Sequence, residues 1–415
     1  MENKYIIKNI TAREILDSRG NPTIKVKVST ETASGEFSVP SGASTGSHEA
    51  EEKRDGDKNR FRGLGALKAV ASVNGEIRKH LIGKDVRNQK EVDSLLIKLD
   101  GTSNKRRLGA NAILGTSIAC AKAAAAASGM QTWEYLAKIL RTRPKVPYLY
   151  QNLINAGKHA SSRLAFQEYM IVPLIGNAGE SLIIADKIKS ELRSRLIKKY
   201  GPFSANFGDE GGFVIEAEKV SEPLKILAEI IKKLQLQDKV GLAIDAAASS
   251  FYEKGKYSVD GKKISAEELL QLYWNLIKKF PIISIEDPFH EDDFDNFSKL
   301  LRLEPGIKVI GDDLTVTNPE RLMRAIREKS INGIIIKPNQ IGTLSETLEV
   351  MRLADSNRIA CVISHRSGET NDDFIADLAY AFGSFGLKAG APNRGERVAK
   401  YNRLIEITDK SYKSN

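Results

Sequence analysis

The sequence predicts an α/β fold in which a (β/α)8 barrel follows a smaller α+β domain. Its 415 residues are too many for one small domain and suit a large barrel with a smaller partner. In the longer C-terminal part, short apolar runs alternate with helical segments at intervals of about 25 residues, close to the size of one β/α unit. Each of these runs also ends on a polar residue. Together these observations favour a barrel whose strand ends line one site.

The N-terminal part has the pattern of a separate α+β domain. Residues 23–28, TIKVKV, alternate with a period of two, and DSRGNP and TASG supply turn residues on either side. Helical patterns follow at residues 65–81, 88–99 and 110–128. We expect this domain to span residues 1–138 and the barrel residues 139–415, with the linker in the proline-interrupted stretch 141–147.

The predicted barrel strands are apolar runs separated by helical patterns. They read VGLAIDA, PIISIEDP, IKVIGDDL, GIIIKPN, IACVISH and FGLKAGAP. Segments such as AEELLQLYWNLIKKF and NPERLMRAIREKS lie between them. Alternating strands and helices imply right-handed crossovers and parallel strands, so the carboxyl ends of the strands should open onto one face.

The polar residues at these strand ends suggest a metal site. In chain order they are Asp245, Glu286, Asp312, Lys337, His365 and Lys388. Three carboxylates in one pocket repel each other unless a cation lies between them, and oxygen ligands without cysteine suit Mg²⁺. We therefore expect a metal at the three carboxylates, with Asp287 and Asp313 pointing elsewhere because strand side chains alternate.

The two lysines at the strand ends suggest a base. We expect Lys337 and Lys388 to lie opposite the carboxylates, where each disfavours the charged form of the other and lowers its pKa. A neutral lysine that faces a metal-bound substrate carboxylate can remove the proton on the adjacent carbon. The residue types therefore favour proton abstraction α to a carboxylate.

Composition excludes several other classes of protein. Two cysteines far apart argue against a disulfide framework and fit a reducing cytoplasm. The N-terminus does not resemble a signal peptide, and the most apolar helical stretch, residues 118–129, is interrupted by Lys122 and is too short to span a bilayer. The net charge of +10 is spread over helical faces without interleaved aromatics, so no obligate nucleic-acid partner is expected.

Long motifs in the chain resemble the enolase family over nearly the full length. They are AREILDSRGNPT, VPSGASTGSHEA, GANAILG, QEYMIVP, GDEGGF, SIEDPF, GDDLTVTNP, KPNQIGT, SHRSGET and KYNRL. The resemblance implies an enolase-type barrel with irregular first units behind an N-terminal α+β domain. It also implies Mg²⁺-dependent dehydration of 2-phosphoglycerate to phosphoenolpyruvate in glycolysis and gluconeogenesis.

The resemblance also implies a role for each site residue. Lys337 would be the general base and Glu210 the general acid. One Mg²⁺ would bind at Asp245, Glu286 and Asp312, and a second would arrive with the substrate at Ser44. The substrate-binding residues would be His159, Glu168, Glu286, Asp312, His365, Arg366, Ser367 and Lys388, with Gln167 behind them.

Departures from the family pattern fall in loops. They include Ala156, Lys158, Ser250 and a short hairpin after Pro173, and none replaces an expected catalytic residue or metal ligand. The alternatives are another dehydratase of the same superfamily, or a non-catalytic paralogue that binds RNA or a cell surface. The family suggests a homodimer or an octamer of dimers, located in the cytoplasm and in some cases at the cell surface or secreted without a signal peptide.

Overall fold

The computed structural model describes residues 2–42, 48–157 and 162–409. Its first domain is built on an antiparallel sheet in the order β1-β2-β3, formed by β1 (Asn9–Leu16), β2 (Pro22–Ser29) and β3 (Ser34–Ser38). The alternation predicted for residues 23–28 is present, because Ile24, Val26 and Val28 are buried on one face. This face packs against the long helix α4 (Ala110–Ala127).

A glycine permits the close packing of α4 on the sheet. A Cβ added at Gly35 would lie 2.2 Å from the backbone nitrogen of Ala123 and 2.3 Å from the carbonyl oxygen of Ala119. Only a residue without a side chain therefore fits at this point of β3. The sequence led us to expect an apolar stretch too short to cross a membrane, but α4 is long and apolar enough to do so by length and composition alone. In the structure, however, 89% of α4 is buried inside the protein. This burial is typical of a core helix.

Further helices cover the first domain. They are α1 (Leu67–Ser72), α2 (Arg78–Leu81), α3 (Gln89–Asp100) and α5 (Thr132–Leu140). The helix predicted over residues 65–81 contains a π-helical stretch, Val73–Ile77, between α1 and α2. Asn74 in this stretch accepts a hydrogen bond from the Ala12 backbone nitrogen at 2.7 Å and so joins the helix to β1.

The second domain is the barrel predicted from the sequence. Among the described residues, eight strands close it in the order β4-β5-β7-β11-β12-β13-β14-β15, and β15 pairs with β4. They are β4 (Tyr148–Asn155), β5 (Glu168–Pro173), β7 (Val240–Asp245), β11 (Ile282–Glu286), β12 (Lys308–Gly311), β13 (Gly333–Ile336), β14 (Ala360–Ser364) and β15 (Gly386–Lys388). Only β5 among these runs antiparallel to its neighbours β4 and β7.

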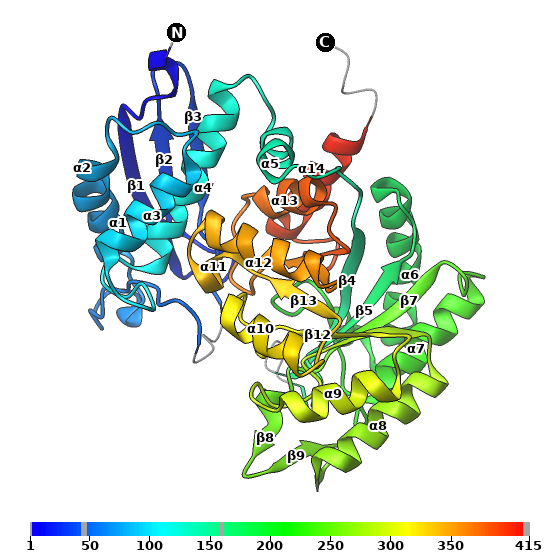
Figure 1. Ribbon diagram of the computed structural model, residues 1–415. Coiled ribbons are helices and arrows are strands. Elements are labelled where there is room, and N and C mark those ends of the chain that lie inside the picture. The colour runs from blue at the N-terminus through cyan, green and yellow to red at the C-terminus, as the bar shows by residue number, and fades with distance from the viewer. Residues whose placement is uncertain (1, 43–47, 158–161, 410–415) are drawn as a thin grey trace.

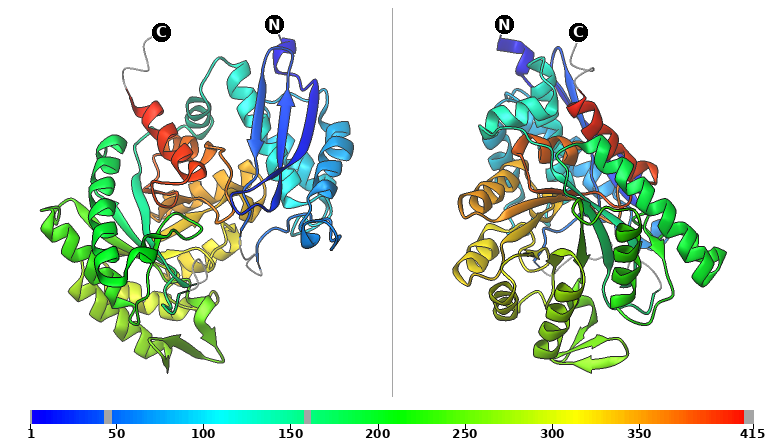
Figure 2. Two further views of the ribbon diagram at one scale, coloured as in Figure 1. Left: turned by 180° about the vertical axis from the view of Figure 1, so that it is seen from behind. Right: turned by 90° about the vertical axis from the view of Figure 1, so that its right-hand side faces the viewer.

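Helices surround the barrel, as Figures 1 and 2 show. They are α6 (Ala178–Tyr200), α7 (Ser221–Lys233), α8 (Ala266–Lys279), α9 (Phe294–Leu303), α10 (Pro319–Arg327), α11 (Pro338–Ile341), α12 (Leu344–Ser356), α13 (Phe374–Phe382) and α14 (Gly395–Thr408). The two-residue strand β6 (Phe213–Val214) pairs with β4. A small sheet of β8 (Tyr252–Glu253), β9 (Lys256–Val259) and β10 (Lys262–Ile264) extends from the lower side in Figure 1.

The two domains share a polar interface. Lys105 of the first domain is almost fully buried and lies 2.9 Å from Glu346 on α12. Asp93 on α3 accepts a hydrogen bond from the Ser345 backbone nitrogen at 2.8 Å. Ser41 pairs with Gly368 through two backbone hydrogen bonds, so the first domain reaches the loop that follows β14.

Candidate active site

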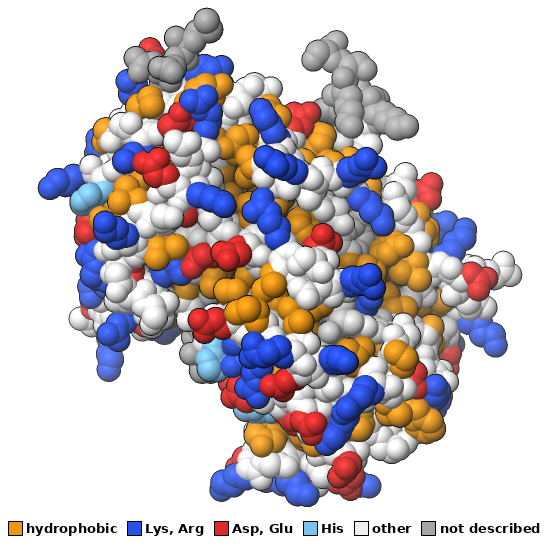
Figure 3. Space-filling view, in the orientation of Figure 1, with side chains coloured by type: hydrophobic (Ala, Val, Ile, Leu, Met, Phe, Trp, Pro, Cys, Tyr) orange, Lys and Arg blue, Asp and Glu red, His pale blue; other side chains and the backbone are white. Residues whose placement is uncertain are grey.

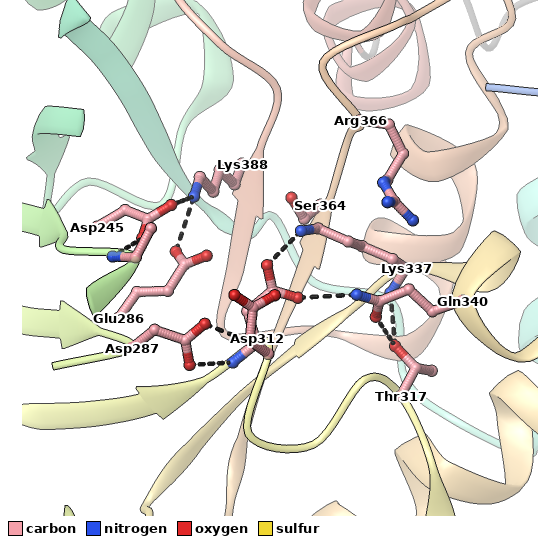
Figure 4. Close-up of polar contacts among 12 residues, drawn as sticks. Asp245, Glu286, Asp287, Asp312, Thr317, Lys337, Gln340, Ser364, Arg366 and Lys388 are labelled. Atoms are coloured by element: carbon pink, nitrogen blue, oxygen red, sulfur yellow. Dashed lines mark hydrogen bonds and ion pairs between the residues drawn. The ribbon is translucent and has the colours of Figure 1, made fainter. Parts of the chain in front are cut away.

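The polar strand ends converge at the mouth of the barrel (Figure 4). Asp245, Glu286 and Lys388 are the last residues of β7, β11 and β15. Asp312, Lys337 and His365 each follow the last residue of β12, β13 and β14. The parallel register places Glu286 directly beside Asp245. The structure thus brings together the six strand-end residues that the sequence pattern singled out.

Glu168 reaches the same mouth from the beginning of a strand. Because β5 runs antiparallel, its first residue lies at the end of the barrel where the parallel strands finish, and Glu168 pairs with Asp245 in the register. The pattern of polar residues at strand ends therefore does not predict Glu168, which was expected only from the family resemblance. The local signal is an acidic residue at the start of the otherwise apolar run EYMIVP.

Lys388 lies among the carboxylates instead of opposite them. Its Nζ is 2.9 Å from Asp245 Oδ2, 2.8 Å from Glu286 Oε2 and 3.1 Å from Glu168 Oε2. Burial alone would lower the pKa of Lys388, but the three carboxylates raise it well above its usual value. The expectation of a lowered pKa at this residue is therefore wrong.

Lys337 contacts a carboxylate as well. Its Nζ forms an ion pair with Asp312 Oδ2, and the amide of Gln340 donates to Asp312 Oδ1 at 3.1 Å. Burial acts to lower the pKa of Lys337, yet the charge of Asp312 outweighs it and the pKa is raised. In this arrangement Lys337 is a charged partner of Asp312. The nearby cations Arg366 and Lys388 act to lower its pKa, as expected, but they do not dominate.

The three predicted metal ligands have the chemistry of a site for a hard cation. Asp245, Glu286 and Asp312 are all buried, and Glu286 Oε1 has no hydrogen-bond partner within the described residues. Burial and the charge of Asp245 raise the pKa of Glu286 well above its usual value. A buried carboxylate oxygen without a donor fits an oxygen-coordinated divalent ion such as Mg²⁺.

Asp287 belongs to the site, contrary to the expectation that it points elsewhere. It lies beyond the end of β11 with a φ of 43°, so the alternation of strand side chains no longer applies to it. Its carboxylate accepts hydrogen bonds from the backbone nitrogens of Asp312 at 2.9 Å and Asp313 at 2.7 Å. Carboxylate oxygens of Asp287, Asp312 and Asp313 lie within 4.8 Å of one another, so Asp313 too stays near the mouth.

Glu210 lies in a buried loop on another side of the mouth. Its Oε2 accepts a hydrogen bond from Asn152 Nδ2 of β4 at 3.0 Å, and His365 Nε2 is 3.5 Å from the same oxygen. Gly211, the next residue, has a φ of 83° and gives the loop its turn. Sequence reasoning missed Asn152, whose only signal is an amide within the buried strand YLYQNLIN.

The residues expected to seat a phosphate contact the first domain. Arg366 Nη1 donates to Glu49 at 2.9 Å and to Asn339 at 3.0 Å, and its backbone nitrogen donates to Glu369 at 3.1 Å. Ser367 is buried next to it. The expected residues Ser44 and His159, together with Lys158, lie outside the described residues.

Comparisons with known proteins agree with this geometry. The model of the family described as "Enolase, N-terminal domain" matches residues 7–136, and that described as "Enolase, C-terminal TIM barrel domain" matches residues 144–414. An enolase of Methanocaldococcus jannaschii is 49% identical over 98% of this chain and 96% of its own length. An enolase of Thermococcus gammatolerans is 47% identical, and enolase B of Dictyostelium discoideum is 45% identical, each over 99% of this chain and 96% of its own length.

Proposed function

This chain belongs to the enolase family, and from that premise we propose how its residues divide the work of the reaction. The activity is that of a phosphopyruvate hydratase, the reversible dehydration of 2-phospho-D-glycerate to phosphoenolpyruvate and water. The name enolase implies a step of glycolysis, and we propose that the reverse reaction serves gluconeogenesis.

Two residues on different sides of the mouth act on the two carbons of the substrate. Lys337 removes the proton from C2, and Glu210 donates a proton to the C3 hydroxyl as it leaves. Lys337 follows β13, whereas Glu210 lies in a loop held by β4, so base and acid come from separate elements. This separation supports a reaction in which one residue removes the proton at C2 and the other protonates the C3 hydroxyl, which leaves as water. Before Lys337 can accept the C2 proton, its ion pair with Asp312 must break and its ammonium group must lose a proton.

Asp245, Glu286 and Asp312 would hold one Mg²⁺ ion, and Ser44, which lies outside the described residues, would be a ligand of a second. Bound Mg²⁺ supplies positive charge that stabilises the negative charge developing on the substrate carboxylate. The buried carboxylates and the unpartnered Glu286 Oε1 support this assignment.

The remaining polar residues hold the substrate. Arg366 and Ser367 bind the phosphate, and Lys388 binds the carboxylate beside the metal. Glu168 supports the acid side with Gln167 behind it, and His365 lies next to Glu210. The family resemblance also assigns substrate binding to His159, which lies outside the described residues. The position of Arg366 and Ser367 in the loop after β14, and of Lys388 at the end of β15, supports these roles because all three lie at the mouth of the barrel.

The observation that carries the proposal is the convergence of Asp245, Glu286, Asp312 and Lys337 at one barrel mouth. The test is the absorbance gain of phosphoenolpyruvate after 2-phosphoglycerate is added to the purified chain. We expect activity with Mg²⁺, loss of activity with a chelator and recovery when excess Mg²⁺ is restored. A chain that shows no gain with Mg²⁺ present, or full activity under chelation, contradicts the proposal.

The organisation of the whole molecule completes the proposal. The first domain comprises residues 1–138 and the barrel residues 139–415, a division supported by the matched ranges 7–136 and 144–414. The chain forms a homodimer or an octamer of dimers in the cytoplasm, with a further fraction at the cell surface or secreted. Light scattering at defined concentrations tests the assembly, and fractionation of the source cells tests the location.

A further inference from the structure

Arg397, in the first turn of α14, is fully buried behind the mouth of the barrel. Its side chain contacts the loop of Glu210 and the loop that follows β14. Nη1 donates to His365 Nδ1 at 2.6 Å and to the Arg366 carbonyl at 2.6 Å. Nη2 donates to the Asp209 carbonyl at 3.2 Å and to the Ser367 carbonyl at 2.7 Å. Each of the four terminal N–H groups of the guanidinium therefore has an acceptor.

The contact with His365 fixes the position of the imidazole proton. A guanidinium has only donors, so the nitrogen that it contacts must accept. Nδ1 of His365 therefore carries no proton, and in the neutral ring the proton is on Nε2. Nε2 is the atom that lies 3.5 Å from Glu210 Oε2.

The fixed tautomer determines which oxygen of Glu210 can carry a proton. Oε2 faces two donors, the Nε2–H of His365 and the amide of Asn152 at 3.0 Å. A proton on Oε2 would point at N–H groups that need an acceptor, and this arrangement is unfavourable. A protonated Glu210 therefore carries its proton on Oε1. Without Arg397 the imidazole could present a bare Nε2 and draw the proton to Oε2.

Arg397 also joins the two loops through their backbones. Its fork spans the carbonyl of Asp209, next to Glu210, and the carbonyls of Arg366 and Ser367. A lysine at this position has one nitrogen and cannot span the same acceptors in the same plane. The guanidinium therefore sets the separation between the acid and the residues expected to bind phosphate.

We propose that Arg397 is a positioning residue for the acid half of the reaction: it fixes the Nε2–H tautomer of His365 and thereby directs the proton of Glu210 to Oε1. This inference rests on the proposed role of Glu210 as the general acid. It assigns Arg397 an effect on loss of the C3 hydroxyl and little effect on removal of the C2 proton.

The tautomer can be measured without turnover. In the full-length protein labelled with ¹⁵N-histidine, the ring nitrogens of His365 are assigned by comparison with His365→Gln. We expect coupling of a bound proton to Nε2 and an unprotonated Nδ1 in the unmodified chain, and a mixture of both tautomers in Arg397→Met. A proton on Nδ1 of the unmodified chain overturns the proposal, whether or not the variant folds.

Kinetics provide the second test, using exchange of the C2 proton in deuterated water and formation of phosphoenolpyruvate. For Arg397→Lys and Arg397→Met we expect dehydration to fall by about 10²-fold, the lower range for general acid catalysis, while exchange stays within about 3-fold. Arg403→Lys is the matched control, since Arg403 lies on the same helix and pairs with Asp377, away from the mouth. We expect it to leave both rates unchanged.

The two outcomes separate this inference from the proposed function. If exchange and dehydration fall equally in the Arg397 variants, Arg397 has a general structural role and the inference is wrong. If instead Glu210→Gln dehydrates at the unmodified rate, the assignment of the acid is wrong, even where the measured tautomer agrees with the geometry.

Discussion

Lys388 Nζ lies 2.8 Å from Glu286 Oε2, so an ammonium group of the chain touches a carboxylate expected to bind metal. The same nitrogen is 2.9 Å from Asp245 Oδ2. The chain thus places one positive charge directly against its proposed metal ligands. A fixed charge in this position repels a divalent ion and at the same time attracts a substrate carboxylate.

Replacing Lys388 by methionine should separate these two effects. We expect Lys388→Met to bind Mg²⁺ at least about tenfold more tightly in the absence of substrate, because a nearby like charge in a protein interior costs several kcal/mol. The KM for 2-phosphoglycerate should rise. Calorimetric Mg²⁺ titration and steady-state kinetics measure these changes. Lys308→Met, at the start of β12, is the control, and equal Mg²⁺ affinity in the two variants would contradict the prediction.

Removing the proposed base should stop the first chemical step. We expect Lys337→Ala to lose detectable exchange of the C2 proton with solvent, since no other lysine in the described part of the chain contacts Asp312. Proton exchange is followed by NMR in deuterated water. The control is Lys329→Ala, which changes an exposed lysine ahead of β13. Normal exchange in Lys337→Ala would show that another group is the base.

Removing the proposed acid should leave that first step intact. Glu210→Gln keeps the size of the side chain and can still contact Asn152, but it has no carboxyl proton to give. We expect exchange at C2 to continue while phosphoenolpyruvate formation falls by about 10²–10⁴-fold. Glu216→Gln, an exposed position in the following segment, is the control. Loss of both activities in Glu210→Gln alone would argue for a role before dehydration.

Asp287 should support the metal site through the backbone of Asp312. We expect Asp287→Asn to weaken Mg²⁺ binding by about 10- to 100-fold, because an amide cannot accept both backbone N–H groups through its two terminal atoms. Asp260→Asn is a close control: Asp260 also has a positive φ, of 50°, and accepts the Val220 backbone nitrogen at 2.9 Å far from the mouth. Similar Mg²⁺ affinities for the two variants would show that Asp287 does not support metal binding.

His365 should remain neutral far below neutral pH. Burial lowers its pKa from 6.5 to about 4, although the charge of Glu210 opposes the shift. Since the unfolded chain then binds the proton more readily, this contribution to stability is fully present above pH 6.5 and is lost as the pH falls towards 4. The loss is on the order of 3 kcal/mol.

Two measurements check the behaviour of His365. The ring resonances of His365 should not titrate between pH 8 and about 5, given the depressed pKa. Denaturant unfolding of His365→Gln should show a smaller loss of stability over pH 6.5 to 4 than the unmodified chain. The exposed residue His80, replaced in the same way, serves as the reference. A midpoint near 6.5 for His365 would contradict the structure.

Much of the fold and part of the site could be predicted because the alternation of strands and helices indicates the direction of most barrel strands. Apolar runs separated by helices implied parallel strands, and parallel strands placed Asp245, Glu286 and Asp312 at one mouth. Local pattern was sufficient here, since each residue's place depends only on where its own strand ends.

The remaining features depend on three-dimensional relations that a local pattern does not contain. The direction of β5, which brings Glu168 to the mouth, is set by pairing with β4 and β7. The contact of Lys388 with Glu286 depends on how the barrel closes. The position of the Asp287 side chain depends on a backbone turn, because β11 ends at the residue before it. Arg397 is distant in sequence from both loops that it joins.

The contact between Glu49 and Arg366 joins the two domains. On the face shown in Figure 3, basic and acidic side chains are intermixed. A barrel produced without the first domain would leave the Arg366 guanidinium without this counter-charge, at the point where an anionic group is expected to bind. Designers who wish to transplant the catalytic barrel must therefore carry the small domain with it, or supply a substitute for Glu49. The candidate active site therefore depends on contacts from both domains.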